Sequence, residues 1–487
     1  MANRELKVMA GSTVLALALA VAAFFAPTSP SENAPTPTAT PTETSDPTAL
    51  TDLTDLNEVF DPSQITEIKL DIPNKSKKVL ENKNRDDYVP ATFQIIVGDK
   101  SSPVMNVGIK IKGTTSRQAI TSTWAYTSFK VKFNFGKGNK TQTLLGKKSL
   151  TLNAMNQDSS KIHETFAYEA YRANGVPASR TGYAHLTLSD NIPKPDRGLF
   201  LVLESLDDEF LADNFVDITQ HLYENNHNFN EIYPSAVGKD VKEDSRFNVK
   251  EGWKASPNRK DLRVFAKEIQ ASGQKLWDFL GTNTDRDALI MQFAVDNFTG
   301  GWDTYSGPLI NNYHLRFSNE GKMTMLPWGL DNTWGENWFN DGKSTNWVKS
   351  YEAPSKAHDD FFFPVDTRTA SFPGSFLIAY GAGVTDSDEM TNYQLGRGQL
   401  FWKCLNFSPC KTQYFQNLQK VSQWATDTKL SERMLATGKL IRKYSNDYNQ
   451  TEQKRTSTWV GKQQERVAKA ISKHCQMATN GLVTSCK

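Results

Sequence analysis

The sequence lacks the signatures of several common enzyme classes. His163, His221 and His314 are scattered along the chain and show no zinc-binding spacing. No G-x-S-x-G motif of a serine hydrolase occurs, and the loop at residues 113–116 is not a Walker A sequence. No internal repeat is visible either. These absences argue against a zinc enzyme, a serine hydrolase, a P-loop protein and a repeat protein.

The chain also has little net charge. Lys and Arg together number 56, Asp and Glu number 54, and the formal net charge is +2. A chain this evenly charged gives no argument for a nucleic-acid partner. Its length of 487 residues suggests two to three domains, or one large domain with two lobes.

Cysteine is scarce, and no pair of cysteines forms the CxxC pattern of a zinc site. The four cysteines lie in two close pairs. In an exported chain we expect them to form two disulfides, and pairing within each close pair is the first choice. A bridge between the two segments is the alternative. The residues concerned are Cys404 with Cys410 and Cys475 with Cys486.

The N-terminal residues 1–26 have the pattern of a targeting segment. Arg4 and Lys7 precede an uncharged run of small and apolar residues, 8–26. This run fits a secretory signal peptide with an Ala-Val-Ala site at 20–22. It is also just long enough to anchor the chain in a membrane if it stays uncleaved. Both alternatives place most of the chain outside the cytoplasm.

The remaining pattern predicts an α+β fold that begins after a linker at residues 27–60, which is rich in Pro and Thr as far as residue 48. Alternation of polar and apolar residues predicts an antiparallel sheet, interrupted by one helix at 161–174. Mainly helical sequence follows, with a polar loop expected at 217–257 and an irregular aromatic insertion at 334–372. The predicted strands are 65–72, 92–97, 107–112, 129–133, 149–153, 183–188 and 198–204.

Residues 289–335 carry the densest chemistry. A helix with Asp296 on its apolar face is followed by Asp303, a predicted hairpin and Asp331. A carboxylate on an apolar helix face is costly unless it is paired or metal-bound. Because a hairpin folds back on itself, Asp303 and Asp331 should lie near one end of it, beside Asn312. Two carboxylates and an amide suit Mg²⁺ or Mn²⁺. The alternative is that both acids are simple turn residues.

Four blocks of sequence carry a resemblance to a known family. They are 107–116 with 129–133; 148–154 with 158–169 and 175–180; 197–204 with 210–211; and 302–303, 312–313 and 326–331. Through these blocks the chain resembles the CotH family, named for spore coat protein H, which has an atypical protein-kinase fold. The resemblance implies a two-lobed, kinase-like fold, with an N-lobe at 61–205 and a C-lobe at 206–487.

The resemblance also implies ATP-dependent phosphoryl transfer, with Mg²⁺ or Mn²⁺, to a secreted or cell-surface protein. Asp303 matches the catalytic acid, and Asn312 and Asp331 match the metal ligands. Glu204 marks the hinge, where backbone groups would bind adenine. Lys130 or Lys132 would hold the phosphates, paired with a carboxylate on helix 161–174; the candidates for that carboxylate are Glu164 and Glu169.

The chain departs from the family pattern in two ways near these residues. The spacing from Asp303 to Asn312 is longer than usual, with residues 306–308 inserted. Family members often carry an acid where this chain has Gly329. One acid fewer could weaken metal binding, so two alternatives stay open. The chain could be a surface binding protein that uses the fold as a scaffold, or it could transfer another group, such as AMP. Asn332, next to Asp331, is expected to lie outside the site.

Overall fold

The computed structural model describes residues 51–335 and 398–487, except 114–116, 123–124, 226–230, 241–245, 253, 302, 308–309 and 446. Its contacts group Leu50–Lys487 into one compact unit. The predicted targeting segment, residues 27–50 of the predicted linker and most of the predicted aromatic insertion lie outside the described residues. The described end of that linker, 51–60, contains a short strand and a short helix. Within the described part, no helix combines the length and the apolar composition needed to span a membrane.

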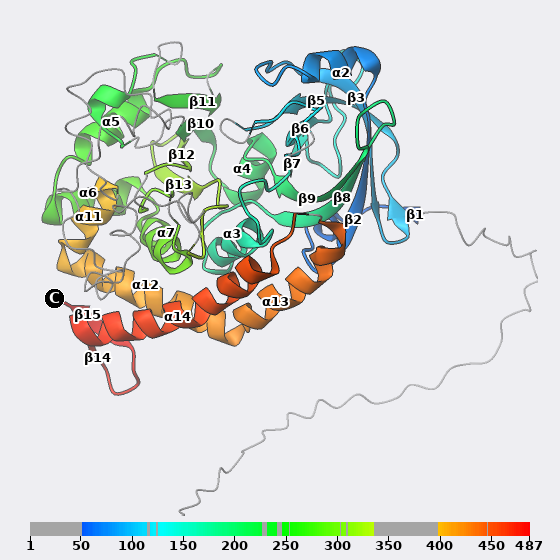
Figure 1. Ribbon diagram of the computed structural model, residues 1–487. Coiled ribbons are helices and arrows are strands. Elements are labelled where there is room, and N and C mark those ends of the chain that lie inside the picture. Colours follow the sequence, from blue (N-terminus) through cyan, green and yellow to red (C-terminus); the bar gives the residue numbers. More distant parts are fainter. Residues whose placement is uncertain are drawn as a thin grey trace, which may run out of the picture. The chain divides into compact units, whose positions relative to one another are not determined.

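Seven strands of the N-terminal half close into a barrel (Figure 1). Their order is β3-β2-β8-β9-β7-β6-β5, and β5 pairs with β3 to complete the ring. Two short strands extend the sheet at its edge, β4 (Lys100–Ser101) and β1 (Thr51–Asp52). The barrel strands are β2 (Ile65–Asp71), β3 (Val89–Val97), β5 (Met105–Ile111), β6 (Phe129–Lys132), β7 (Ser149–Asn153), β8 (Thr181–Leu188) and β9 (Asp196–Glu204).

The α+β class is confirmed, but the sheet differs from the predicted antiparallel sheet in two respects. First, the sheet closes, because β3 pairs through residues 89–93 with β5 and through residues 92–96 with β2. Second, β2 pairs in parallel with β8. Alternation tells which side chains of a strand share a face, and those side chains do fill the barrel, as Ile109, Val131 and Leu152 show. It does not tell which strands are neighbours.

A second sheet has four strands in the order β11-β10-β12-β13. Strands β12 (Tyr313–Ser318) and β13 (Met323–Pro327) form the predicted hairpin, with Tyr313 opposite Pro327. Strands β10 (Thr219–Asn225) and β11 (Phe247–Glu251) lie in the segment that was expected to be a loop, so that prediction is wrong. Their polar residues are compatible with strands because one face of this sheet carries charged side chains, among them the ion pair of Glu224 and Lys250.

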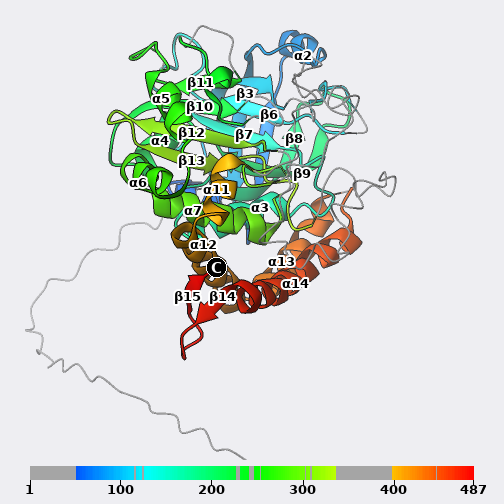
Figure 2. The same cartoon turned by 90° about the vertical axis from the view of Figure 1, so that its left-hand side faces the viewer.

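Helices pack on both sheets. The apolar side chains of the helices and of the second sheet form a single large core. Helix α12 packs along α7, and α12, α13 and α14 line one side of the unit, beneath α3 and α7 (Figures 1 and 2). The helices are α1 (Leu56–Val59), α2 (Asn74–Leu80), α3 (His163–Ala173), α4 (Asp208–Asn214), α5 (Lys260–Glu268), α6 (Gly273–Asn283), α7 (Arg286–Thr299), α11 (Gln399–Leu405), α12 (Ser408–Asp427), α13 (Leu430–Ile441) and α14 (Gln450–His474).

Two disulfides stabilise the C-terminal region. Cys404 bonds to Cys410 between α11 and α12. Cys475 bonds to Cys486 across the terminal hairpin of β14 (Cys475–Met477) and β15 (Val483–Cys486). The preferred pairing within each close pair is therefore confirmed, and both bonds indicate an oxidising environment.

The closed barrel leads to a prediction for Gly182 on β8. A Cβ atom there would lie 2.1 Å from the backbone oxygen of Val59, which cannot move aside without shifting the chain. Gly182→Ala should therefore destabilise the protein by about 1–3 kcal/mol. Gly461→Ala is the matched control, because Gly461 lies exposed within α14 and has open space around it. This change should stabilise by about 0.5–1 kcal/mol. Urea denaturation measures both, and equal effects would contradict the prediction.

Candidate active site

The loop that carries Asp303 begins where α7 ends. Gly300 closes the helix in a left-handed conformation. Asp296, one turn earlier, is 1% exposed and fully paired. It accepts hydrogen bonds from the Tyr171 hydroxyl on α3, from the Ser306 hydroxyl at 2.7 Å and from the Ser306 backbone at 3.2 Å. The carboxylate that looked costly on the helix face therefore joins α3 to the loop that follows α7.

The hairpin brings Asn312 against that loop. Its Nδ2 atom donates to Asp303 Oδ2 at 2.6 Å and to the carbonyl oxygen of Gly329 at 3.1 Å. These two bonds occupy the donor end of the amide and leave its Oδ1 atom as an acceptor. Gly329 has a φ of +57°, and a Cβ there would lie 2.7 Å from Asn312 Cγ. Glycine at this position thus allows Asn312 to approach Asp303.

Three buried carboxylates converge at this end of the hairpin. Glu164 enters from α3 with 2% exposure, and the Asn153 amide donates to it. Burial, followed by the charge of Asp331, raises the pKa of Glu164 to about 8. Burial and the Asp331 charge also raise the pKa of Asp303 well above its ordinary value. Burial raises the pKa of Asp331, and Lys112 opposes that rise. These three carboxylates are called the acid cluster below.

Lys112 is a cation that acts on two members of the acid cluster, and it was not among the residues predicted from the sequence. It lowers the pKa of Glu164 and of Asp331 by charge attraction. Its ammonium lies 5.9 Å from the centre of the Trp328 ring. The residue stands just after β5, within the block of sequence that was read only as a strand and a loop. The only sequence pattern that could have pointed to Lys112 is the alternation of lysines at 110 and 112. This pattern does not show which strand lies beside α3.

The two predicted lysines lie elsewhere on the barrel. Lys130 pairs across strands with Lys110. Burial, then the charge of Lys250, lowers the pKa of Lys130 to about 8, while Glu224 opposes this. Lys132 lies 5.7 Å from the centre of the Tyr88 ring. Lys130 therefore belongs with Lys110, Lys112 and Lys250 to a group of cations between the barrel and the second sheet, the basic strip.

Two other predicted residues do not join the acid cluster. Glu169 forms two hydrogen bonds of 2.7 Å with Arg433 on α13. Glu204 is buried, and although burial alone would raise its pKa, Arg180 and Lys147 hold that pKa below its ordinary value. The hinge role assigned to the backbone near Glu204 stays a prediction.

Asn332 was expected to lie outside the site, and this is wrong. It is 3% exposed, and its side chain lowers the pKa of Asp303 by a hydrogen bond. The residue therefore supports Asp303 and cannot serve as a neutral control.

The acid cluster offers the kind of oxygen donor that a hard divalent cation prefers, although its three carboxylates do not all lie within 4.8 Å of one another. Asp303 Oδ1 is buried and has no hydrogen-bond partner in the described part of the chain. Asn312 Oδ1 is left as an acceptor, while the His163 imidazole beside Asp331 contacts the Asp331 backbone carbonyl and the Thr456 hydroxyl. A donor set made of carboxylate and amide oxygens is the one that Mg²⁺ and Mn²⁺ prefer. A separate acidic group, Asp207–Glu209, starts α4 but is paired with Lys148.

The raised pKa of Glu164 predicts a pH-dependent stability. Its folded pKa of about 8 lies above the ordinary value of 4.5. The stabilisation from protonated Glu164 is therefore complete below about pH 4.5 and is lost as pH rises through 8. Glu164→Gln removes this loss, so the variant should melt a few degrees above the parent at pH 8 and close to it at pH 5. Thermal unfolding at both pH values measures the difference.

The matched control for that prediction is Glu169→Gln, the same change on the same helix. It removes a partner from Arg433 and should not raise the melting temperature at either pH. A Glu164→Gln effect that does not change with pH would contradict the assignment of a raised pKa.

Comparison with known proteins identifies the family of the chain. The family model described as CotH kinase protein matches residues 109–477, which is more than half of the chain and contains every residue of the acid cluster. No curated protein matches the chain. The chain therefore belongs to the CotH kinase protein family.

Proposed function

We propose that this protein is a kinase that transfers the γ-phosphoryl group of ATP, with Mg²⁺ or Mn²⁺, to a Ser or Thr hydroxyl of a secreted or cell-surface protein. The observation that carries the proposal is the meeting of Asp303, Asn312, Asp331, Glu164 and Lys112 from separate segments at one end of a hairpin. Phosphoryl transfer requires mainly positioning and charge stabilisation, which such a set of residues can supply.

The proposal gives each residue a distinct task. Asn312 and Asp331 would hold the cation, which would neutralise charge on the phosphates when bound. Lys112 would place a point charge against the phosphates, and Glu164 would hold that lysine in position. Asp303, fixed by its bond to Asn312, would orient the acceptor hydroxyl and take its proton.

The same proposal interprets the two halves of the fold as kinase-like lobes. The barrel would cover the nucleotide from one side, with the basic strip facing the phosphates. The second sheet and the helices would present the acid cluster from the other side. Adenine would lie near the end of β9, where backbone groups after Glu204 are available. Lys130 and Lys250 would then contribute charge along the phosphate path.

Gly329 is compatible with an active enzyme in this proposal. Its left-handed φ and the nearness of the Asn312 side chain leave little space for a side chain. An exported location is supported by the two disulfides and would make a secreted or surface protein the acceptor.

Labelled ATP tests the proposed reaction. The protein is incubated with Mg²⁺ or Mn²⁺ and a generic protein acceptor, with label in either the γ- or the α-phosphate. Transfer of γ-label only supports a kinase. Transfer of α-label would instead show AMP transfer, and no transfer under any condition would favour a binding protein on this scaffold.

Replacing Asp331 and replacing Asp303 should impair different steps of the proposed reaction. Asp331→Ala should lose metal-dependent ATP binding as well as transfer, because it removes a cation ligand. Asp303→Ala should keep most ATP affinity and lose transfer by about 10²–10⁴-fold, the usual contribution of a general base. Calorimetric ATP binding with and without Mg²⁺ and label transfer measure both effects.

Asp278→Ala is the control for these two variants, since Asp278 lies on α6 and bonds only to Gln274 on the same exposed face. If Asp331→Ala binds Mg-ATP as the parent does, the cation assignment is wrong. If both site variants transfer normally, the kinase proposal is wrong.

A second pair of variants separates the lysines. Lys112→Met should weaken Mg-ATP binding by about 10- to 100-fold, the value of a hydrogen bond to a charged group. Lys132→Met should change binding little, because that side chain lies against Tyr88 rather than the acid cluster. The same calorimetric titration measures both. A larger loss for Lys132→Met would show that the residue predicted from sequence holds the phosphates.

A further inference from the structure

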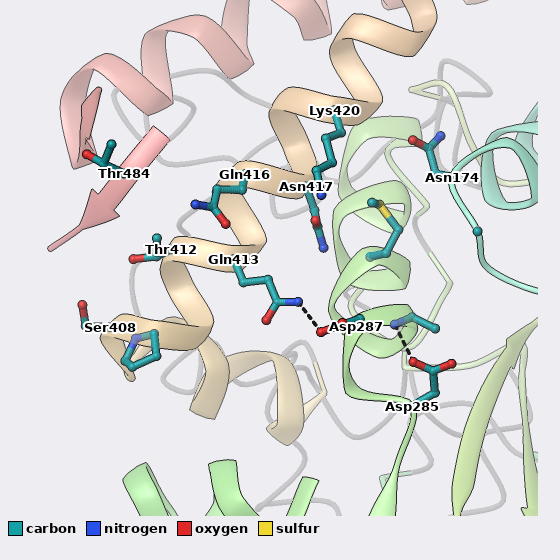
Figure 3. Close-up of a pocket in the computed structure, with 14 residues that line it drawn as sticks. Asn174, Asp285, Asp287, Ser408, Thr412, Gln413, Gln416, Asn417, Lys420 and Thr484 are labelled. Atoms are coloured by element: carbon teal, nitrogen blue, oxygen red, sulfur yellow. Dashed lines mark hydrogen bonds between the residues drawn. The ribbon is translucent and has the colours of Figure 1, made fainter. Parts of the chain in front are cut away.

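A second polar site lies away from the acid cluster. An open groove of about 700 Å³ runs between the first turns of α7 and the helix α12, bounded by the end of α3 and by β15 (Figure 3). None of the residues that line it belongs to the acid cluster or the basic strip. The described residues that form its walls are rich in amide, carboxylate and hydroxyl side chains and include no aromatic ring.

Asn417 on α12 directs its amide into the groove. The residue is only 3% exposed, yet its amide has no hydrogen bond to any residue in the described part of the chain. Figure 3 shows the amide pointing into the space between α12 and α7. The amide atoms are not among the buried polar atoms that lack a partner, so they contact solvent in the groove. A ligand that both donates and accepts hydrogen bonds could take the place of that solvent.

The other side chains in the groove narrow the class of ligand. Gln413, Asn417 and Lys420 follow each other at i, i+4 and i+7 on α12, so they form one row, and Asn174 faces them from the end of α3. A primary amide offers one acceptor and two donors, which matches the N–H and C=O of a peptide group. Sugar rings are commonly held on aromatic faces, and none lines this groove. A row of amides without aromatic rings favours an extended peptide.

The charges in the groove are separated along its length. Asp285 and Asp287 lie at one end, while Lys420 and Asn174 lie near the other (Figure 3). Asp287 already accepts from Gln413 at 2.7 Å, and Asp285 caps α7. Each carboxylate still has acceptor sites for a cationic side chain. A peptide with a basic residue at one end and an acidic residue at the other would complement this arrangement.

We propose that the groove docks an extended segment of the acceptor protein, with its backbone on the amides, a basic side chain at Asp285 and Asp287, and an acidic one at Lys420. The identity of the occupant as the acceptor rests on the proposed kinase function. Helix α7 leads from the groove to the loop of Asp303, and its 14 residues span about 21 Å. The docked segment would thus lie at least about six extended residues from the hydroxyl that is modified.

Calorimetry with the full chain tests the proposal, without nucleotide or metal. The probes are two capped hexapeptides, Lys-Ser-Gly-Ser-Ala-Glu and its reverse, a version with Glu at both ends, and maltotriose. At least one mixed-charge peptide should bind, and the version with two Glu residues should bind at least about tenfold more weakly. Asn417→Leu should weaken the binding of the mixed-charge peptide about tenfold, which is the effect of 1.4 kcal/mol.

Gln423→Leu is the matched control, because Gln423 is an amide on the same helix that is exposed and bonds only to Asp427. It should leave peptide binding unchanged. Asp287→Asn provides a second test if Asn417→Leu does not fold, and it should weaken the peptides that carry Lys. The proposal is overturned if no peptide binds at millimolar concentration, if maltotriose binds in their place, or if neither groove variant weakens binding. Because no nucleotide is present, such a result leaves the kinase proposal to the labelled-ATP test.

Discussion

Burial of like charges in one place is the constraint on which the rest of this structure depends. Glu164, Asp303 and Asp331 are each raised in pKa first by their own burial, and Asp331 repels the other two. The surrounding fold holds these acids together, and as a result they take up protons more readily than ordinary carboxyl groups. Lys112 offsets part of the repulsion, and the Asn312 amide fixes Asp303.

Helix α3 organises that support, because several of its residues hold the segment after β13. The Nδ1 atom of His163 lies 2.8 Å from the carbonyl oxygen of Asp331, and the Tyr168 hydroxyl accepts from the Gly329 backbone. On another side of the same helix, Arg433 donates two hydrogen bonds to the Glu169 carboxylate. The C-terminal helices therefore fix the rotation of α3, and with it the direction in which Glu164 points. The ion pair of Glu169 is structural support for a site that it does not enter.

Local patterns in the sequence were enough to find most elements, but they did not find the partners of those elements. The alternation in β5 and β6 marks their inward faces correctly, yet Lys112 and Lys130 look equivalent on that basis. Only the position of β5 relative to α3 shows that Lys112 is the one near Glu164. The strands β10 and β11 were missed for a related reason. Their polar residues suggested a loop, and they are strands because β12 supplies the backbone partners of β10.

The sequence by itself determined the α+β class, the hairpin between Asn312 and Asp331, and the pairing of cysteines that lie close together. These features depend on residues near each other along the chain, where periodicity, turn residues and short loops act directly. Tertiary structure alone decided the closure of the barrel, which lysine and which glutamate lie near Asp331, and the contact of Asn332 with Asp303. Each of these depends on segments far apart in the sequence, whose contacts are selected by packing and by the electrostatics of burial, and no local pattern records them.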